Sequence, residues 1–424
     1  MNSNYKASER NIARLLSKIP LIKNTVKYVY SRFVFITNKK NHVHCTTFPI
    51  KAITKLQKET FFGYYDKSPV NSSGSLMLSY ISSYPTTRKN QFKKVSIELG
   101  VFSLDDGEII LSLPTRAYNW QQGARAHWIN DELFIYNDYD EESNRYISRV
   151  FSVMHKKEIK AFQLPVQDSF KTDFFLSLNY RRLQALRPDY GYSNVAQLTS
   201  AELKQTENDG IWLVNYATAE ITLLYSLDDI IKCGNDIRFS EAYHKVNHIM
   251  ISPSGEQFIF LHRYYVGKRK FDRLLLGDLT GNKLKILSDH EMVSHCFWAD
   301  NDTILGYLRG PDSIDAYWLI DIYTGVFSKL PTSTLEKYGD GHPNVYKDWF
   351  VTDTYPDKAR MQHLMLCNWK TGELRELGHF FHGFKYNGET RCDLHPRFSP
   401  DGKSIFFDSV YDGARRLYRM DLEL

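Results

Sequence analysis

The stretch at residues 394–409, LHPRFSPDGKSIFFDS, decides the fold. Residues 399–402 have the composition of a tight turn, in which the proline fixes φ and the glycine supplies a positive φ. The alternating, aromatic-rich run at 404–407 is typical of a half-buried strand. The stretch therefore predicts a β-hairpin with a histidine, His395, at its entrance.

The same pattern occurs three more times upstream. His248, His295 and His342 each open a run that continues into a polar turn and a strand-like segment, such as HIMISPSGEQFIFLHR from His248. The spacings between the four histidines are 47, 47 and 53 residues. A period of roughly 40 to 50 residues built from short strands is typical of the blades of a β-propeller.

Three weaker copies bring the number of repeats to seven. They lie at residues 61–80, 123–139 and 169–182. Tyr64 occupies the histidine position of the first copy. Alignment of Trp128 with Trp298 places Arg125 at the histidine position of the second copy, and His127 two residues further on, which puts both on one face of a strand.

The sequence thus predicts an all-β fold, a seven-bladed β-propeller spanning residues 43–424. We expect residues 46–56 to form a lone strand that pairs into the last blade, whose third strand lies at 416–422, because this closes two open sheet edges. The segment 183–208 departs from the repeat and is expected to be a long loop on one face, where function is often found.

The positive charge of the chain is concentrated in an N-terminal arm, residues 1–42. Within residues 1–40 there are nine Lys/Arg and one acid, for +8, whereas the whole chain carries +5. Apolar residues at helical spacing in 8–19, and an aromatic and basic run at 21–36, predict a basic helical arm. We expect residues 8–36 to contact an anionic membrane surface, to pack as a helix on the side of the propeller, or to form a poorly ordered arm. The near-neutral remainder does not favour nucleic acid as a ligand.

Composition also suggests where the protein works. The five cysteines are widely spaced and predict no disulfide framework. The first 20 residues are charged throughout, unlike a signal peptide, and no run of 18 apolar residues is present. We expect a cytoplasmic monomer, with a peripheral position at the inner face of the membrane if the arm binds there.

The four histidines suggest a metal centre. The first strand of each propeller blade lines the central channel, so His248, His295, His342 and His395 are expected at one level of a ring. Converging imidazoles suit a divalent metal ion such as zinc, or manganese or calcium, and Cys392 could replace one of them. The alternative is that the histidines only end strands through hydrogen bonds.

Other polar residues are expected at the same mouth. Tyr64 and Arg125 belong to the ring, and further candidates for substrate binding or catalysis are Arg187, Tyr190, Tyr192, Tyr243, His244 and Arg263. A mixture of Arg, His, Tyr and metal suits an acidic sugar. The cations neutralise its carboxylate, one side chain removes the α-proton, and a tyrosine protonates the leaving oxygen. This chemistry is β-elimination of a uronate.

Several motifs resemble the seven-bladed propeller polysaccharide lyases, most closely the ulvan lyase type and more distantly the oligogalacturonate lyases. They are FFGYYDKSP (61–69), NWQQGARAHW (119–128), RPDYGY (187–192), HKVNHIMISPSGEQFIFLHR (244–263), DTYPD (353–357) and RCDLHPRFSPDGKSIFFDS (391–409). The resemblance implies a propeller with a His-rich metal site. It also implies a catalytic histidine at His127, a tyrosine at Tyr190 or Tyr192, and an arginine at Arg187 or Arg263 that neutralises the uronate.

Two functional hypotheses follow. The first is a lyase-like protein that cleaves a uronate-containing polysaccharide or oligosaccharide by metal-assisted β-elimination in surface polysaccharide metabolism. The second is a non-catalytic glycan-binding or scaffold propeller in capsule or O-antigen biosynthesis. A glycosyltransferase is a weaker third reading, because no nucleotide-sugar site is visible in the sequence.

Overall fold

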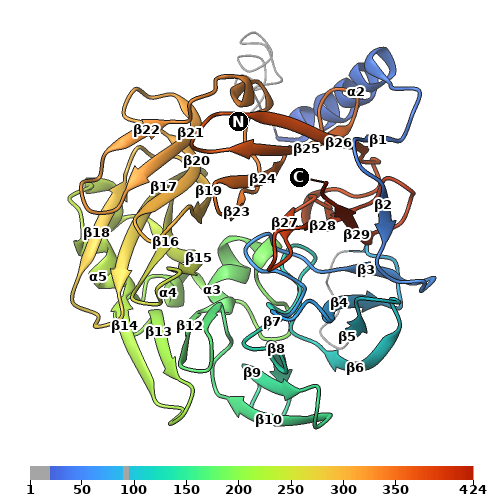
Figure 1. Cartoon of the computed structure of the whole chain (residues 1–424). Coiled ribbons are helices and arrows are strands. Elements are labelled where there is room, and N and C mark those ends of the chain that lie inside the picture. The colour runs from blue at the N-terminus through green and yellow to red at the C-terminus, as the bar shows by residue number, and fades with distance from the viewer. Residues whose placement is uncertain (1–19, 89–94, 424) are drawn as a thin grey trace.

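A computed structural model describes residues 20–88 and 95–423 and confirms the predicted seven-bladed propeller (Figure 1). Each blade is an antiparallel sheet, and the sheets follow one another around a central axis. The strands of blades 1 to 4, in chain order, are β3 (Glu59–Phe61), β4 (Leu76–Ser82), β5 (Ile97–Ser103), β6 (Ile109–Thr115), β7 (His127–Trp128), β8 (Leu133–Asp140), β9 (Arg145–Ser152), β10 (Lys157–Phe162), β11 (Asp168–Phe170), β12 (Phe174–Leu178), β13 (Gly210–Asn215), β14 (Ile221–Ser226), β15 (Tyr243–Ile251), β16 (Gln257–Val266), β17 (Arg269–Asp278) and β18 (Leu284–Ser288).

Blades 5 to 7 complete the ring and receive two strands from the N-terminal part of the chain. Their strands are β19 (Val293–Trp298), β20 (Thr303–Arg309), β21 (Asp315–Asp321), β22 (Phe327–Lys329), β23 (Asn344–Tyr346), β24 (Trp349–Asp353), β25 (Met361–Asn368), β26 (Leu374–Phe381), β27 (Arg397–Phe398), β28 (Ser404–Ser409) and β29 (Arg416–Asp421). Early in the chain, β1 (His44–Thr46) pairs with β26 of blade 6, and β2 (Ile50–Ala52) pairs with β29 of blade 7.

The predicted closure of the ring is confirmed, but the single strand expected at 46–56 is wrong. Pro49 separates β1 from β2, and the two strands join different blades. Because proline lacks the N–H that a continuous ladder needs, the chain leaves one sheet there and enters the next.

Short helices interrupt the propeller at a few places. They are α3 (Tyr180–Leu186), η1 (Pro188–Tyr190), α4 (Ser200–Leu203), α5 (Leu227–Lys232), η2 (Ile237–Ser240), η3 (Thr334–Tyr338) and η4 (Gly388–Thr390). The long loop expected at 183–208 is therefore partly helical. Asn179 caps α3 by accepting from two backbone N–H groups, and Thr199 and Glu202 form a capping box on α4.

The equivalence of the repeats extends to the backbone and to the contacts between blades. Arg125, His248 and His395 all adopt positive φ, at 55°, 52° and 43°, which is uncommon for residues other than glycine. The indoles of Trp128 and Trp298 donate to a backbone carbonyl of the preceding blade, at 2.7 Å and 3.0 Å. The alignment that placed Arg125 at the histidine position therefore holds in three dimensions.

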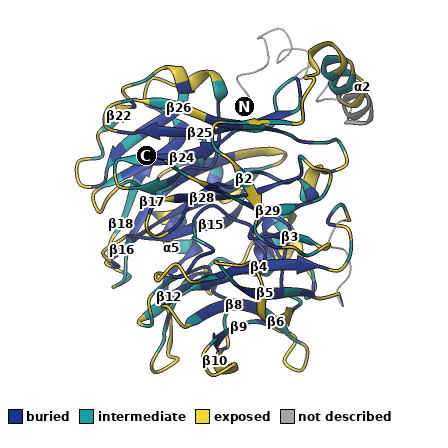
Figure 2. Ribbon diagram, turned by 45° about the vertical axis from the view of Figure 1, so that its right-hand side comes forward, coloured by how far each residue is buried: buried dark blue, intermediate teal, exposed yellow. Residues whose placement is uncertain are grey.

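The N-terminal arm contains the helix α2 (Pro20–Asn38), which projects from the edge of the propeller (Figure 2). Phe35 packs against Phe381 and Phe384, with ring centroids 5.7 Å and 5.5 Å apart. The helix expected at 8–19 lies outside the described residues. Among the described residues, no helix is both long and apolar enough to cross a membrane.

Closure through β2 should contribute to the stability of the whole ring. The Ile53 N–H donates to the Leu417 carbonyl at 3.1 Å, directly after β2. Ile53→Pro removes this donor, and we expect it to lower the free energy of unfolding by about 1–3 kcal/mol more than Ile53→Ala does. Denaturant unfolding of both variants measures the difference, and equal midpoints would contradict a role for this bond in closure.

Candidate functional site

The structure brings the four repeat histidines together around one tyrosine. The imidazole of His342 lies 4.1 Å from that of His295 and 4.3 Å from that of His395, measured between ring centroids. His248 is 6.0 Å from His295. The ring of Tyr64 lies within 5.1 to 6.5 Å of all four, and its hydroxyl is 2.8 Å from Nδ1 of His248. We call these five residues the channel ring.

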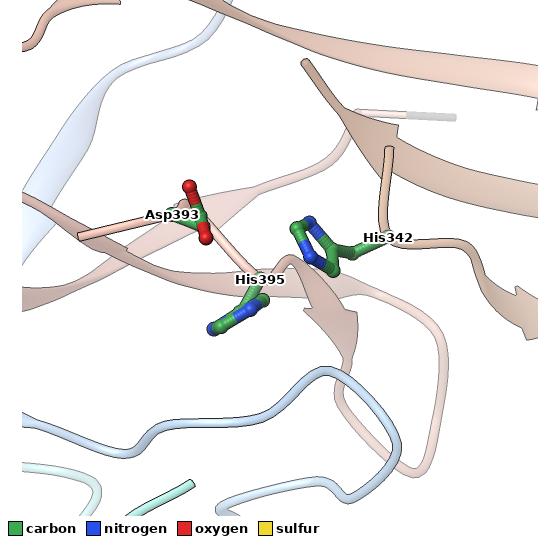
Figure 3. Close-up of side chains that lie close together, drawn as sticks. All are labelled: His342, Asp393 and His395. Carbon is green, nitrogen blue, oxygen red and sulfur yellow. The ribbon is translucent and has the colours of Figure 1, made fainter. Parts of the chain in front are cut away.

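Three side chains at this place could hold a metal ion: His342, Asp393 and His395 (Figure 3). They point toward one another, and their ligand atoms lie within 4.8 Å of one another. All three are buried. The Nε2 atoms of His342 and His395 have no hydrogen-bond partner among the described residues. Two buried, unpartnered nitrogens beside a carboxylate match the donor set of a divalent cation.

Asp353, at the end of β24, binds His342 and His395 from two different blades. Its Oδ1 accepts the Nδ1–H of His342 at 2.7 Å and the backbone N–H of the same residue at 2.8 Å, and its Oδ2 accepts the backbone N–H of His395 at 3.0 Å. The bond to Nδ1 leaves Nε2 of His342 with its lone pair toward the cluster. A carboxylate on the far nitrogen is the usual second partner of a metal-binding histidine.

His342 is electrostatically distinct from its neighbour His395. Burial lowers the pKa of both imidazoles, but at His342 the adjacent Asp353 carboxylate outweighs burial and raises its pKa above the usual value. Burial and the charge of His342 hold the pKa of His395 well below its usual value. The cluster therefore favours a single positive charge, either one proton or one bound cation, over two positive charges close together.

The sequence suggested that Cys392 could replace one of the four imidazoles, whereas its neighbour Asp393 is the residue that lies in the cluster. Cys392 is buried, and burial raises the pKa of its thiol to about 12, which disfavours the thiolate that binds metals. Arg391 donates to both oxygens of Asp393, at 2.6 to 2.9 Å. The spacing of Asp393 two residues before His395 was the available signal, because alternate residues of an extended segment share a face.

Of the two candidate tyrosines at 187–192, Tyr190 reaches the channel ring. Its ring lies 5.1 Å from that of His248 and 5.9 Å from that of Tyr64. The guanidinium of Arg187 lies over the face of Tyr190, 5.1 Å from its centroid, and pairs with Asp189 at 3.2 Å. Arg187 is about one-third exposed, so it faces both the solvent and the ring.

Tyr192 and Tyr243 lie apart from these contacts. Tyr192 is fully buried, stacks on Tyr180 at 4.3 Å, and accepts from the side chain of Asn137 at 2.9 Å. Tyr243 is half-buried under the ammonium group of Lys204.

Beside His248 lies a concentration of positive charge. Arg263 donates to the buried carboxylate of Asp272, and Lys270 lies 3.4 Å from the same carboxylate. Fully buried Lys245 stands opposite Arg263 in the β15–β16 ladder. We call Arg187, Lys245 and Arg263 the basic group.

In the part of the chain that the structure describes, no carboxylate forms an ion pair with Lys245. Its Nζ donates to the side-chain oxygen of Asn247 at 2.8 Å. Burial, followed by the charges of Arg263 and Arg187, holds the pKa of Lys245 well below its usual value. The same charges, after burial and His295, lower the pKa of His248. Arg187, Arg263 and Lys270 alone outnumber the two carboxylates of Asp189 and Asp272, so positive charge is in excess beside His248.

Arg125 and His127 are held in contacts within the protein. The guanidinium of Arg125 makes two bonds to Asp66, at 2.9 Å and 2.7 Å, and also donates to the Gln167 carbonyl. Nδ1 of His127 lies 2.8 Å from the Arg125 carbonyl, and its Nε2 lies 2.6 Å from the Ser169 hydroxyl. The structure places both in the joints between blades 1, 2 and 3, and their predicted functional roles stay predictions.

His244 belongs to a buried chain of hydrogen bonds. Its Nε2 lies 2.9 Å from the Phe239 carbonyl and its Nδ1 lies 3.0 Å from Nε2 of His262, whose Nδ1 faces the guanidinium of Arg273 at 2.9 Å. Because a carbonyl only accepts and a guanidinium only donates, every bond is satisfied when both imidazoles are neutral. Burial lowers the pKa of His244 to about 4.

Comparison with known proteins supports the fold. No family model matches the sequence, and no curated protein does either. An oligogalacturonate lyase in complex with manganese has a TM-score of 0.59 at 15% identity and covers 89% of this chain and 94% of its own. The oligogalacturonate lyase of Vibrio parahaemolyticus gives 0.57 at 12% identity, with 89% and 96% covered. A prolyl endopeptidase structure gives 0.50 at 9% identity, covering 99% of this chain and 53% of its own.

At such low identities the likeness shows the fold alone. It agrees with the more distant relation that the motifs indicated, to oligogalacturonate lyases, and gives no support to the ulvan lyase type. Fold and neighbours define the chain as a seven-bladed β-propeller with oligogalacturonate lyases among its structural neighbours.

The hydrogen bonds through His244 require a neutral imidazole, and we therefore expect the stability of the fold to depend on pH. The usual histidine pKa of 6.5 applies to the unfolded chain and about 4 to the folded one, so the unfolded state binds the proton first as pH falls. Stability should be full above pH 6.5 and decline until about pH 4, with His244 contributing a loss of about 2 kcal/mol at about pH 5.

Denaturant unfolding between about pH 7 and about pH 5 tests this dependence. His244→Gln keeps a donor for the Phe239 carbonyl but cannot titrate, so it should flatten the pH dependence. His155, which is exposed, supplies the control variant His155→Gln, expected to keep the wild-type slope. If the free energy of unfolding of His244→Gln depends on pH as strongly as that of the wild type, the neutral imidazole of His244 is not the cause of the dependence.

Proposed function

We propose that the protein is a lyase-like propeller that binds a uronate-containing oligosaccharide or polysaccharide at the channel ring. The observation that carries this proposal is the basic group beside His248 of the channel ring. Arg187 and Arg263 each pair with one carboxylate, while Lys245 contacts the amide oxygen of Asn247, so positive charge is in excess here. Buried positive charge is costly unless an anion approaches it. A carboxylate-bearing sugar supplies that anion.

The cluster of His342, Asp393 and His395 fits a divalent cation. Two imidazole nitrogens and one carboxylate suit zinc or manganese better than calcium, which prefers oxygen donors throughout. Support comes from the unpartnered Nε2 atoms and from the manganese named for the oligogalacturonate lyase neighbour. When bound, such an ion acts as a Lewis acid toward a carboxylate.

The residues of the chain have distinct roles in this proposal. Arg187, which is partly exposed, pairs with the uronate carboxylate, and Lys245 and Arg263 add potential behind it. In β-elimination a base takes the proton α to the carboxylate, a carbon–carbon double bond forms, and the β carbon–oxygen bond breaks. His248 accepts the proton and the Tyr190 hydroxyl protonates the leaving oxygen, because these two lie together at the ring.

A panel of uronate-containing polysaccharides and oligosaccharides tests the reaction. We expect wild-type protein to form unsaturated uronate product, followed by its ultraviolet absorbance. Arg187→Gln should lose about 10²-fold in rate, the effect of removing one charge-stabilising donor. Arg181→Gln is the matched control, since Arg181 lies on the neighbouring α3 and pairs with Glu202 instead.

If no glycan of the panel yields unsaturated product, the lyase hypothesis is wrong. Binding of the same glycans without product, measured by calorimetry and weakened by Arg187→Gln, would favour the non-catalytic alternative, a glycan-binding module in surface polysaccharide synthesis. If the protein neither binds these glycans nor forms product from them, both hypotheses, the lyase and the glycan-binding module, are wrong.

We also propose that α2 contacts an anionic membrane surface. Val29, Phe33 and Ile36 recur at helical spacing and are exposed, with Ile36 at 73%. The lysines at 39 and 40 follow directly and are exposed as well. Apolar side chains combined with basic ones are typical of helices that lie in the interface of an anionic bilayer.

Vesicle co-sedimentation tests this contact. We expect binding to vesicles rich in anionic lipid and little binding to zwitterionic ones. Phe33→Ser/Ile36→Ser should weaken binding at least about tenfold, because it removes two large apolar groups from the contact. Met154→Ser changes an equally exposed apolar residue on the propeller and should have no effect. Equal binding of the double variant and the wild type would refute the contact.

A further inference from the structure

A second cluster of potential ligands lies on the outer strands of blade 6, away from the channel ring. His363 on β25 and His379 on β26 are directly paired in the ladder, so their side chains share one face of the sheet. Glu376 lies on the same strand as His379, and its Oε1 lies 2.7 Å from Nδ1 of His363 and 3.1 Å from Nδ1 of His379. Ligand atoms of the three lie within 4.8 Å of one another.

The N-terminal segment brings another histidine to this place. Exposed His42 stands between α2 and β1, and its Nε2 lies 2.8 Å from Nε2 of His379. The contact joins residues 337 positions apart in the chain. Next to it, Cys45 on β1 is paired with His379 across the ladder and is an exposed free thiol. β1, which follows the arm, lies beside β26 of blade 6 (Figure 1), and the His42–His379 contact brings a side chain of the arm to the cluster.

Carboxylates orient both imidazoles of the blade. Glu376 bonds to each, and Asp357 lies 3.5 Å from Nε2 of His363. Tyr338 donates its hydroxyl to the other oxygen of Glu376 at 3.4 Å. An acceptor on each histidine and a partner on the carboxylate are the supporting contacts that metal sites on proteins use. The alternative is a hydrogen-bonded surface network that needs no ion.

We propose that His363, Glu376 and His379, joined by His42, bind a transition-metal cation such as Zn²⁺ and thereby fasten the N-terminal arm to blade 6. We call this the rim site. Imidazoles with a single carboxylate favour zinc, copper or nickel over calcium and magnesium. An ion held by both His42 and the blade fixes the chain between α2 and β1. The rim site does not depend on the proposed lyase function.

Zinc content after dialysis is the direct test. Full-length protein without an affinity tag is equilibrated with Zn²⁺ and its bound metal is measured by mass spectrometry. The variant His363→Gln/His379→Gln should lose one equivalent relative to the control His155→Gln, whose histidine is exposed and lies outside both clusters. His342→Gln/His395→Gln, which alters the channel ring, should keep the rim equivalent. Equal zinc content in the rim variant and the control would overturn the proposal.

Fastening of the arm has its own readout. Zn²⁺ should slow proteolytic cleavage and amide hydrogen exchange at residues 39–43 in the wild type and in His155→Gln, and not in the rim variant. His42→Gln should weaken Zn²⁺ binding at least about tenfold, a loss that even outer-shell changes cause. Circular dichroism without metal checks that each variant keeps the wild-type fold. If Zn²⁺ gives the folded rim variant the same protection as the wild type, the proposal that the ion fastens the arm to blade 6 is refuted.

Discussion

The carboxylate of Asp353 is the contact on which the candidate site depends. It sits at the inner end of blade 6 and receives hydrogen bonds from the backbone and ring of His342 and from the backbone of His395 in blade 7. One buried group thus joins two blades and orients the imidazole of His342. A site assembled from separate blades needs such a shared anchor, because small shifts between supporting elements would separate its ligands.

A second buried ion pair connects this anchor to the start of the ring. Arg397 donates to Asp408 and to the Gly63 carbonyl, while Asp408 accepts the backbone N–H groups of Phe62 and Gly63. These bonds position the segment that carries Tyr64 against the last blade. Together with β2 they close the propeller, and the closure itself places Tyr64 among the four histidines.

The buried cations around the channel differ in whether a carboxylate pairs with them. Arg125 has a full carboxylate partner in Asp66, whereas Lys245 has only the amide oxygen of Asn247. A paired cation strengthens the joint between blades, and an unpaired one leaves potential available to a ligand. Because Lys245 adds a cation beside the paired Arg187 and Arg263, the basic group is a better candidate than Arg125 for the proposed contact with an acidic sugar.

The sequence by itself determined the repeat, its strands and turns, and the ring of His248, His295, His342 and His395, because these follow from local patterns repeated at a fixed period. The tertiary structure decided which neighbours of that ring take part. Tyr190 contacts it, whereas Tyr192 stacks on Tyr180. Asp393 lies in the cluster with His342 and His395, and His244 lies in a buried series of hydrogen bonds with His262. The physical reason is that burial, backbone direction and the choice of charged partner depend on residues from other blades, which a local pattern cannot identify.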